Sequence, residues 1–403
     1  MALDARAKQL AAEGVDIVNL SVGEPDFDTP AAARAGGISA IQSGFTRYTA
    51  VAGTRELRRA ISAKLLQENL LDYSPDQIVV SNGAKQSIYN ALLVLLDPGD
   101  EVLIPAPYWV SYPEMVKLAG GVPITVPTDE TAGFKVTAAA VATHLGPRAR
   151  GIIINNPSNP TGAVYAREEL ESLAQLAVAH GIFILSDEIY ERLTYDGARA
   201  ESVASLGPDV RRLTITVNGF SKAYAMTGWR MGYAAAESHL AQAMGDLQSQ
   251  TTSGPSSITQ EAARAALEAD QSPVEAMRKE FDGRRRYVLE RLAAIPGMEM
   301  TAVPTGAFYV FPNVSKHFGR TLGGRVVRDA ADLAAVVLET AGVAVVPGTP
   351  FGSPEHLRLS YAVSTEKLKE AMDRLERFFS QASASTGPAA SAPERSRRDE
   401  PGG

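Results

Sequence analysis

The chain has 403 residues, of which 39 are Lys or Arg and 46 are Asp or Glu, so its formal net charge at neutral pH is −7. A net negative chain binds polyanions poorly, so nucleic acid and anionic membrane surfaces are not expected as partners. Apolar residues make up 45% of the chain, and no apolar run approaches the roughly 20 residues that span a bilayer. There is no cysteine, which excludes disulfides, cysteine-ligated metals and a thiol nucleophile.

Amphipathic stretches alternate with short β-rich runs between about residues 54 and 247, which predicts an α/β sheet of mostly parallel strands. The expected strands are residues 77–80, 101–104, 121–126, 151–155, 182–185 and 213–217. Uninterrupted apolar runs such as Ile152-Ile153-Ile154 are typical of strands that are covered on both faces. Residues 84–96 have helical periodicity, and the turn at 97–100 ends that helix.

The pattern changes after two long helical stretches, which are expected at residues 257–269 and 273–294. The strands expected beyond them are residues 298–303, 306–311, 343–346 and 357–361, and a helix at 365–379 follows. We therefore expect a large domain over residues 33–272 and a smaller α/β domain formed by residues 1–32 and 273–380. Residues 381–403 contain no Leu, Ile, Val, Met or aromatic residue, so they are expected to be a disordered tail.

Polar side chains follow three consecutive predicted strands of the large domain. Asn159, Asp187 and Lys222 come after the strands at 151–155, 182–185 and 213–217. In a mostly parallel sheet, ligands bind outside the carboxyl ends of the strands, so these side chains mark a candidate site. Each also has a plainer explanation, because Asp often caps a helix, Asn-Pro often forms a turn and a single Lys is usually a solvated charge.

The segment from Ser221 to Tyr233 decides between these explanations. It reads SKAYAMTGWRMGY, with Lys222 and Arg230 eight residues apart and glycines at 228 and 232. This pattern resembles the pyridoxal-phosphate lysine signature of class I and II aminotransferases. Further matches to the family are the segments 21–27, 47–48, 107–113 and 356–360, so the resemblance covers about residues 3–380.

The resemblance implies fold type I, with a mostly parallel seven-stranded sheet in the large domain, and pyridoxal 5′-phosphate as the cofactor. Amino transfer needs an amine that bonds to the cofactor aldehyde and then moves the Cα proton, and Lys222 matches that role. Asp187 would hold the ring nitrogen protonated, so that the ring can accept electrons. Tyr190 and Asn159 would hold the phenolic oxygen of the ring; a core tyrosine and a turn are the alternatives.

Other matched residues would contact the ring face, the phosphate and the substrate. Trp109 would stack on the ring, although it could also be a core residue. The residues matched to the phosphate end are Gly83, Ala84, Lys85, Ser221, Arg230 and, from the neighbouring subunit, Tyr48. The contribution of Tyr48 implies a homodimer with shared active sites. The residues matched to the substrate are Gly23, Lys85, Trp109, Asn159 and Arg358.

Three of these residues would define the substrate. Arg358 lies in an apolar strand, where a guanidinium is costly unless paired, and it would bind the α-carboxylate. An internal ion pair is the alternative. Gly23 would meet the same carboxylate through its backbone, or is a turn residue. Lys85 is associated in the family with the distal carboxylate of dicarboxylic substrates, and a solvated lysine at a helix start is the alternative.

The resemblance is greatest to the bacterial aspartate aminotransferase branch of the family. It implies transfer of the amino group of L-aspartate to 2-oxoglutarate by ping-pong chemistry, giving oxaloacetate and L-glutamate. A prephenate, aromatic or biosynthesis-specific aminotransferase of the same fold is the alternative. A DNA-binding regulator is not expected, because the matching region begins at about residue 3.

Some features of the sequence depart from the family or lie outside it. Many relatives have a serine three residues before the lysine, whereas this chain has Gly219. The five histidines have no spacing with carboxylates that suggests a metal site, so no metal is expected. The N-terminus lacks the pattern of a signal peptide, so a cytoplasmic location is expected.

Overall fold

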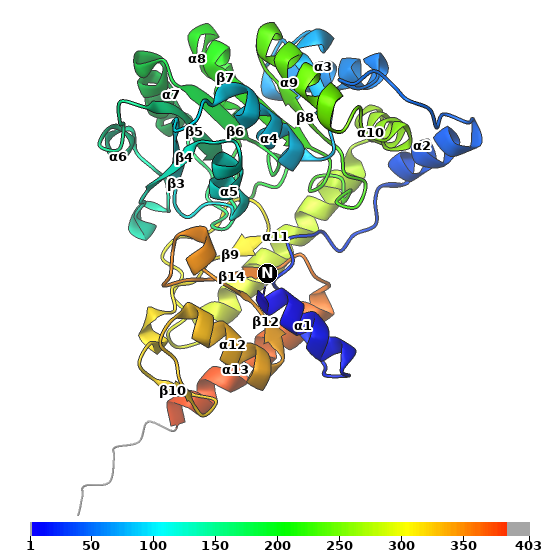
Figure 1. Ribbon diagram of the computed structural model, residues 1–403. Helices are drawn as coiled ribbons and strands as arrows, with labels where there is room; N and C mark the ends of the chain where they lie inside the picture. The colour runs from blue at the N-terminus through cyan, green and yellow to red at the C-terminus, as the bar shows by residue number, and fades with distance from the viewer. Residues whose placement is uncertain (1, 385–403) are drawn as a thin grey trace, which may run out of the picture.

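The computed structural model describes residues 2–384. At its centre is a seven-stranded sheet with the strand order β2-β8-β7-β6-β5-β3-β4 (Figure 1). Its strands are β2 (Ile78–Ser81), β3 (Glu101–Pro105), β4 (Val122–Val126), β5 (Ala149–Asn155), β6 (Phe183–Asp187), β7 (Thr214–Gly219) and β8 (Gly232–Ala235). Neighbouring strands are parallel except that β8 is antiparallel to both β2 and β7. The prediction of a mostly parallel seven-stranded sheet is confirmed.

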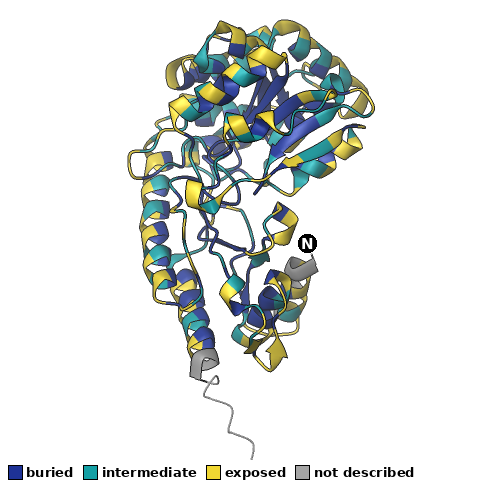
Figure 2. Ribbon diagram, turned by 90° about the vertical axis from the view of Figure 1, so that its left-hand side faces the viewer, coloured by how far each residue is buried: buried dark blue, intermediate teal, exposed yellow. Residues whose placement is uncertain are grey.

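Helices cover both faces of this sheet, because alternate residues of each strand point to opposite faces. On β5, Ile153 packs in one core with residues of α4 and α5. Ile152 and Ile154 pack in another core with residues of α7. The helices of this part are α2 (Ala31–Gln42), α3 (Arg55–Asn69), α4 (Ala84–Leu95), α5 (Ser111–Leu118), α6 (Ala138–Ala142), α7 (Arg167–His180), α8 (Pro208–Leu213), α9 (Ser238–Thr251) and α10 (Ser257–Glu268). Figure 2 shows the sheet largely buried and the outer faces of the helices exposed.

The remaining helices and strands form a second part with its own core, which we call the C-terminal lobe (residues 272–384 with residues 2–20). Its helices are α1 (Ala2–Ala12), α11 (Ser272–Ala293), α12 (Ala330–Ala341) and α13 (Thr365–Ala384). Its main sheet has the antiparallel order β13-β14-β9, and the other strands pair as β1–β12 and β10–β11. The strands are β1 (Val18–Asn19), β9 (Tyr309–Val310), β10 (Thr321–Leu322), β11 (Arg325–Val326), β12 (Val343–Ala344), β13 (Val346–Pro347) and β14 (Leu357–Ser360).

Two segments join the lobe to the rest of the chain. The first is the stretch between β1 and α2, and β1 itself is held in the lobe by its parallel pairing with β12. Helix α11 contributes Val274 to a core beside the seven-stranded sheet and Phe281, Val288 and Leu292 to the core of the lobe (Figure 1). The domain boundaries expected near residues 32, 272 and 380 stay a prediction.

Some details differ from the expectations. The single strand expected at 343–346 is divided between β12 and β13, which belong to different sheets. Strand β8 was not among the runs read as strands, because its sequence GYAA is short and begins with glycine. The strand expected at 298–303 was wrong: only Glu299 forms an isolated bridge, to Asn313, and Pro304, which cannot donate to a ladder, follows the segment. Helix α13 continues to Ala384, so residues 381–384 of the expected tail are helical, since alanine and serine can extend an established helix. Residues 385–403 lie outside the described residues.

No helix among residues 2–384 is long and apolar enough to cross a bilayer.

Candidate active site

The carboxyl ends of β2, β3, β5, β6 and β7 lie at one edge of the large sheet, as their pairing requires. The loops that follow these strands carry most of the predicted site residues. Strand β14 of the C-terminal lobe adds Arg358 from the opposite side, where its guanidinium reaches Asn159. The predicted site is therefore a junction between the sheet edge and the lobe.

Lys222 is half-buried at the centre of this junction. Its Nζ donates a hydrogen bond to the carbonyl oxygen of Gly23 at 2.6 Å and lies 5.8 Å from the ring centre of Tyr190 and 5.7 Å from that of Phe308. Burial lowers the pKa of the Lys222 amine to about 8, and the positive charge of Arg358 acts in the same direction. About a tenth of the Lys222 amine is thus neutral and nucleophilic at pH 7.

Asp187 is buried where β6 ends. Its Oδ2 accepts a hydrogen bond of 2.6 Å from the Tyr112 hydroxyl, and its Oδ1 accepts one of 3.2 Å from the Ile189 amide. Burial raises the pKa of Asp187 to about 6, against the lowering effect of these hydrogen bonds and of Lys222. Most of the carboxyl is therefore ionised at neutral pH in a site that favours a positive partner.

Arg358 is buried and has no carboxylate partner among residues 2–384, so the alternative of an internal ion pair is wrong. Its Nη1 donates to Asn159 Oδ1 at 3.1 Å, and its Nη2 donates to the Ser21 carbonyl oxygen at 2.6 Å. Its Nε is buried without a partner. The guanidinium stacks 4.5 Å from the ring centre of Tyr309 and 5.0 Å from that of Phe351. A buried cation with an unused donor is suited to an anionic ligand.

Tyr190 and Gly23 meet at Tyr309. The hydroxyls of Tyr190 and Tyr309 are hydrogen-bonded at 2.9 Å, and burial raises the pKa of Tyr190 well above its ordinary value. A Cβ at Gly23 would lie 2.2 Å from the Tyr309 hydroxyl oxygen. Gly23 is thus required for close approach, which lets its carbonyl reach Lys222.

The first turn of α4 forms a cradle opposite Arg230. Gly83 has a φ of +86° and precedes the helix, and a Cβ there would lie 2.7 Å from Arg230 Nη2. Arg230 itself is held by the carbonyl oxygens of Thr227 (3.0 Å) and Asn82 (3.4 Å). The amides of Ala84 and Lys85 have no protein acceptor in the described part of the chain. Free helix N–H groups beside a guanidinium are suited to a phosphate.

Trp109 and Lys85 lie together at the mouth of the site. The Lys85 Nζ lies 4.7 Å from the ring centre of Trp109, and Trp109 packs edge-on against Tyr112 with 5.3 Å between ring centres. Burial and the nearby Arg230 lower the pKa of Lys85. Lys85 is therefore held in the site region although part of it is exposed to solvent.

The structure does not bring Tyr48 into this cluster. Tyr48 lies between α2 and α3, and 97% of its surface is exposed. Ser221, next to the lysine, is buried. A Cβ at Gly219 would lie 2.9 Å from the Met231 carbonyl oxygen and 3.0 Å from Gly232 Cα, so the local packing of β7 against β8 explains why a side chain is disfavoured there.

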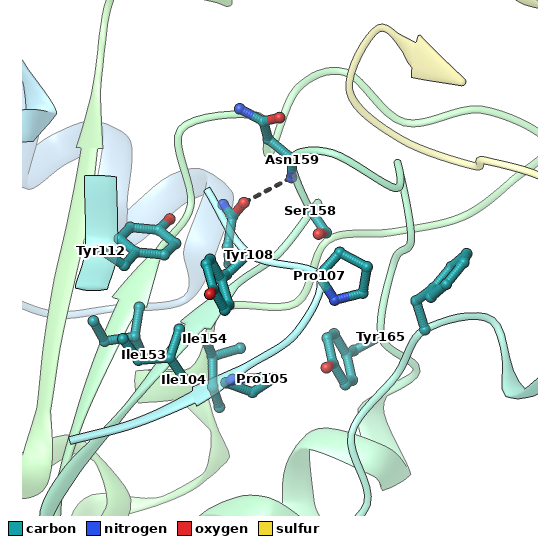
Figure 3. Close-up of a pocket in the computed structure, with 12 residues that line it drawn as sticks. Ile104, Pro105, Pro107, Tyr108, Tyr112, Ile153, Ile154, Ser158, Asn159 and Tyr165 are labelled. Carbon is teal, nitrogen blue, oxygen red and sulfur yellow. Dashed lines mark hydrogen bonds between the residues drawn. The ribbon is translucent and has the colours of Figure 1, made fainter. Parts of the chain in front are cut away.

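A small pocket continues from the site between the loops that follow β3 and β5 (Figure 3). Asn159 lies at its edge, and Tyr112 lines it together with Tyr108 and Tyr165. The loop that carries Asn159 is fixed by a hydrogen bond of 2.8 Å from its own amide to Asn155 Oδ1. The pocket is lined by both apolar and polar side chains, and it shares Asn159 and Tyr112 with the site.

Sequence reasoning missed Tyr112 and Tyr309. Tyr112 lies in the first turn of α5, three residues after Trp109, and its closeness in sequence to Trp109 was the available signal. Tyr309 lies on a two-residue strand that contacts Arg358 from the neighbouring strand. No local pattern distinguishes Tyr309 from a core tyrosine.

A site with a lysine of lowered pKa, a buried carboxylate and two clusters of anion donors is typical of enzymes that bind a phosphorylated cofactor and a carboxylate substrate. Comparison with known proteins gives the same class. The profile of the family "Aminotransferase class I and II" matches residues 15–375. The chain therefore belongs to the class I and II aminotransferases, which use pyridoxal 5′-phosphate.

Individual relatives cover nearly the whole chain. The aspartate aminotransferase of Geobacillus stearothermophilus is 46% identical over 379 residues, which are 94% of this chain and 95% of the relative. The aspartate/prephenate aminotransferase of Cereibacter sphaeroides is 46% identical over 380 residues, with the same coverage. The crystal structure of the aspartate aminotransferase from Rhizobium meliloti superposes with a TM-score of 0.90 at 42% identity, covering 94% of this chain and 95% of that one.

The residues present fit the cofactor. The cradle at Gly83 offers free amides and a guanidinium to a phosphate, and the buried Asp187 offers a carboxylate to a protonated ring nitrogen. Lys222 offers an amine of lowered pKa between them.

Proposed function

We propose that this aminotransferase transfers the amino group of L-aspartate to 2-oxoglutarate, and that Arg358 is the principal substrate-binding residue. The observation that supports this most directly is the buried guanidinium, whose Nε has no partner and which has no carboxylate partner among residues 2–384. A planar guanidinium binds a carboxylate through two parallel hydrogen bonds. Asn159 and the Ser21 carbonyl oxygen fix its orientation before the substrate arrives.

Lys222 is the proposed catalytic base. When bound, the cofactor supplies an aldehyde for the amino group and a ring that takes up the electron pair left at Cα. The Nζ of Lys222 would hold the cofactor in the absence of substrate, and the free amine would accept the proton that leaves Cα. Because burial and Arg358 lower its pKa to about 8, the amine can both accept and release a proton near neutral pH.

Asp187 and Tyr190 are the proposed partners of the cofactor ring. Asp187 accepts the hydrogen bond of a protonated ring nitrogen, and the Tyr112 hydrogen bond keeps its carboxylate in place. Tyr190 and Asn159 would hold the phenolic oxygen, and Trp109 would cover the ring face. The amides of α4 with Arg230 hold the phosphate.

The preference for a dicarboxylic donor is assigned to Lys85. Its Nζ is held over Trp109, where it can meet a distal carboxylate while Arg358 binds the α-carboxylate. The relative from Cereibacter sphaeroides is named for prephenate as well as aspartate. Prephenate also carries two carboxylates, so it is the second candidate substrate.

The proposal includes a homodimer, in which the Tyr48 hydroxyl reaches the phosphate of the partner subunit. The exposure of Tyr48, together with that of Ile38 (55%) and Ile41 (58%) on α2, supports a subunit contact at this surface. A cytoplasmic location completes the proposal, and the cysteine-free sequence is compatible with it.

A half-reaction screen tests the proposal. The cofactor-loaded protein is mixed with single amino acids, and the change in cofactor absorbance is followed with time. Aspartate and glutamate should react fastest, and Lys222→Ala should abolish the reaction. Lys85→Ala should lower kcat/KM for aspartate by at least tenfold but leave that for alanine nearly unchanged. Equal or faster rates with aromatic or aliphatic donors would contradict the dicarboxylate preference.

A further inference from the structure

His356 directly precedes β14, the strand that carries Arg358, and it is buried at the junction between the lobe and the sheet part. Its ring stacks on Phe311 with 4.8 Å between centres and an interplanar angle of 5°, and it meets Phe134 edge-on at 5.3 Å. Its Nε2 lies 2.7 Å from Glu130 Oε2, and its Nδ1 lies 2.8 Å from the Ser353 hydroxyl oxygen. Because a carboxylate only accepts, the proton of the neutral ring is on Nε2, and the Ser353 hydroxyl donates to Nδ1.

His356, Ser353 and Glu130 are linked by hydrogen bonds, and of these three residues Glu130 belongs to the sheet side. It lies in the short helix η2 (Glu130–Ala132) between β4 and α6. Its carboxylate also accepts a hydrogen bond from Asn313 Nδ2, at 3.3 and 3.2 Å to its two oxygens. The Asn313 Oδ1 is occupied by the amide and hydroxyl of Ser315, so its NH₂ group is directed at Glu130. One carboxylate thus binds two side chains of the lobe.

Residues of the same junction also pack against Arg358. Phe134 from the sheet side packs with Phe311 and Phe351 of the lobe in one small buried cluster. Phe351 in turn lies under the guanidinium of Arg358. The Tyr108 amide, next to Trp109, donates a hydrogen bond of 3.0 Å to the Phe351 carbonyl oxygen. The contacts of His356 with Phe311 and Phe134 thus join the Glu130–His356 hydrogen bond to the cluster that lies against Arg358.

We propose that Glu130 and His356 are positioning residues for substrate binding: they fix β14 against the sheet side, so that Arg358 is aligned with the substrate α-carboxylate before binding. This inference rests on the proposed function of Arg358. The pair does not touch the proposed cofactor or substrate. Loss of the contact should weaken substrate binding, because small displacements of an orienting group are costly, while the chemistry at Lys222 is preserved once substrate is bound.

The test compares Glu130→Ala, Glu130→Gln and His356→Gln with the wild type. Glu130→Ala should raise KM for aspartate and for 2-oxoglutarate about tenfold with kcat within about twofold. Glu130→Gln keeps an oxygen that accepts one hydrogen bond, so its KM should rise only about threefold. The double variant Glu130→Ala/His356→Gln should be no worse than the more affected single variant, since the two residues act as a unit.

Glu299→Ala is the matched control. Glu299 pairs with Lys316 inside the lobe, and its backbone is bridged to Asn313, so this variant also loses a carboxylate contact near the same strand but none across the junction. Its KM should equal that of the wild type.

Amide hydrogen exchange of the cofactor-free protein gives a second readout. In Glu130→Ala, residues 311–315 and 353–360 should exchange about tenfold faster, with strands β5 and β6 unchanged. Unchanged exchange in these segments together with an unchanged KM would overturn the inference, as would a fall in kcat at constant KM. If the wild type transfers no amino group from any donor, the proposed function fails, whereas the exchange measurement still tests the junction.

Discussion

Lys222 is the residue whose surroundings most directly predict a measurable pH dependence. Its pKa is lowered to about 8 by burial and by Arg358, and only the neutral amine can bond to the cofactor aldehyde. The rate of cofactor attachment to the cofactor-free protein should rise about tenfold per pH unit up to about pH 8 and be constant above it. Stopped-flow absorbance measures this profile.

The control is Arg358→Gln, which removes the positive charge that contributes to the lowered pKa of Lys222. In this variant, the pH at which the attachment rate becomes constant should be higher. A wild-type rate that rises up to about pH 10 would show that the pKa of Lys222 is not lowered.

Asp187 should lower the stability of the cofactor-free protein at alkaline pH. Its pKa in the folded chain, about 6, lies above the ordinary value of 3.8, so the folded state binds the proton more tightly than the unfolded state. The ionised carboxylate therefore costs stability above pH 6, and this cost disappears as the pH falls towards 4. Asp187→Asn should raise the free energy of unfolding by about 1 to 3 kcal/mol at pH 8 and leave it unchanged at pH 4.

Denaturant titrations of the cofactor-free protein at both pH values measure this difference. The variant should also lose cofactor-dependent activity, since the ring nitrogen loses its carboxylate partner. An equal effect at pH 8 and pH 4 would contradict the assigned cause.

Among the elements, the close approach of β8 to the start of α4 determines the geometry of the phosphate cradle. A Cβ at Gly232 would lie 2.3 Å from the Ala84 amide nitrogen and 2.5 Å from the Gly83 carbonyl carbon. Gly232→Ala should therefore displace the helix start, weaken cofactor affinity at least tenfold and cost about 1 to 3 kcal/mol of stability. Equilibrium titration with cofactor and thermal unfolding measure the two effects.

Gly245→Ala on α9 is the matched control, because a Cβ there meets no atom within 4 Å. It should leave cofactor affinity unchanged and stabilise the protein by about 0.5 to 1 kcal/mol, as expected for glycine in a helix interior. Equal cofactor affinities for the two variants would show that the approach of β8 does not define the cradle.

The sequence predicted the elements that have a strong local signal and failed where long-range contacts decide. Helix α4 begins at Ala84 as expected, because its apolar spacing and the glycine before it are local. Strand β8 could not be predicted from its own sequence. Its first residue is a glycine because α4, which is far away in the sequence, leaves no room for a Cβ there. Within the site, Lys222 and Asp187 follow strands and could be found, whereas Tyr309 acquires its place only through the pairing of β9 with β14. Likewise, nothing local indicates that His356 meets Glu130.

For the whole molecule, the exposed Tyr48 predicts that two subunits share each site. A dimer of one Lys222→Ala subunit and one Tyr48→Ala subunit contains one site with both residues intact, if Tyr48 acts in the partner's site. Co-expression should therefore give activity that neither variant has alone, up to about half that of the wild type per dimer. Activity of the purified mixed dimer, isolated with two affinity tags, measures this.

Sedimentation at low concentration provides the accompanying check, since the mass of one chain is 42.8 kDa. Absence of complementation in a verified mixed dimer would place Tyr48 in the site of its own subunit, or in neither.

Helix α11 determines how the lobe can move against the sheet part. Its Val274 belongs to the core on one side and its Phe281 and Leu292 to the core on the other, and Arg285 ties its middle to Asp196 and the Pro304 carbonyl oxygen. One of the two connections is thus a continuous helix of 22 residues, whereas the other, between β1 and α2, has no regular secondary structure. Long helices curve by small changes spread over many hydrogen bonds. Because α11 packs in both cores, a displacement of the lobe against the sheet part bends this helix, and the stiffness of the helix opposes the accompanying displacement of Arg358.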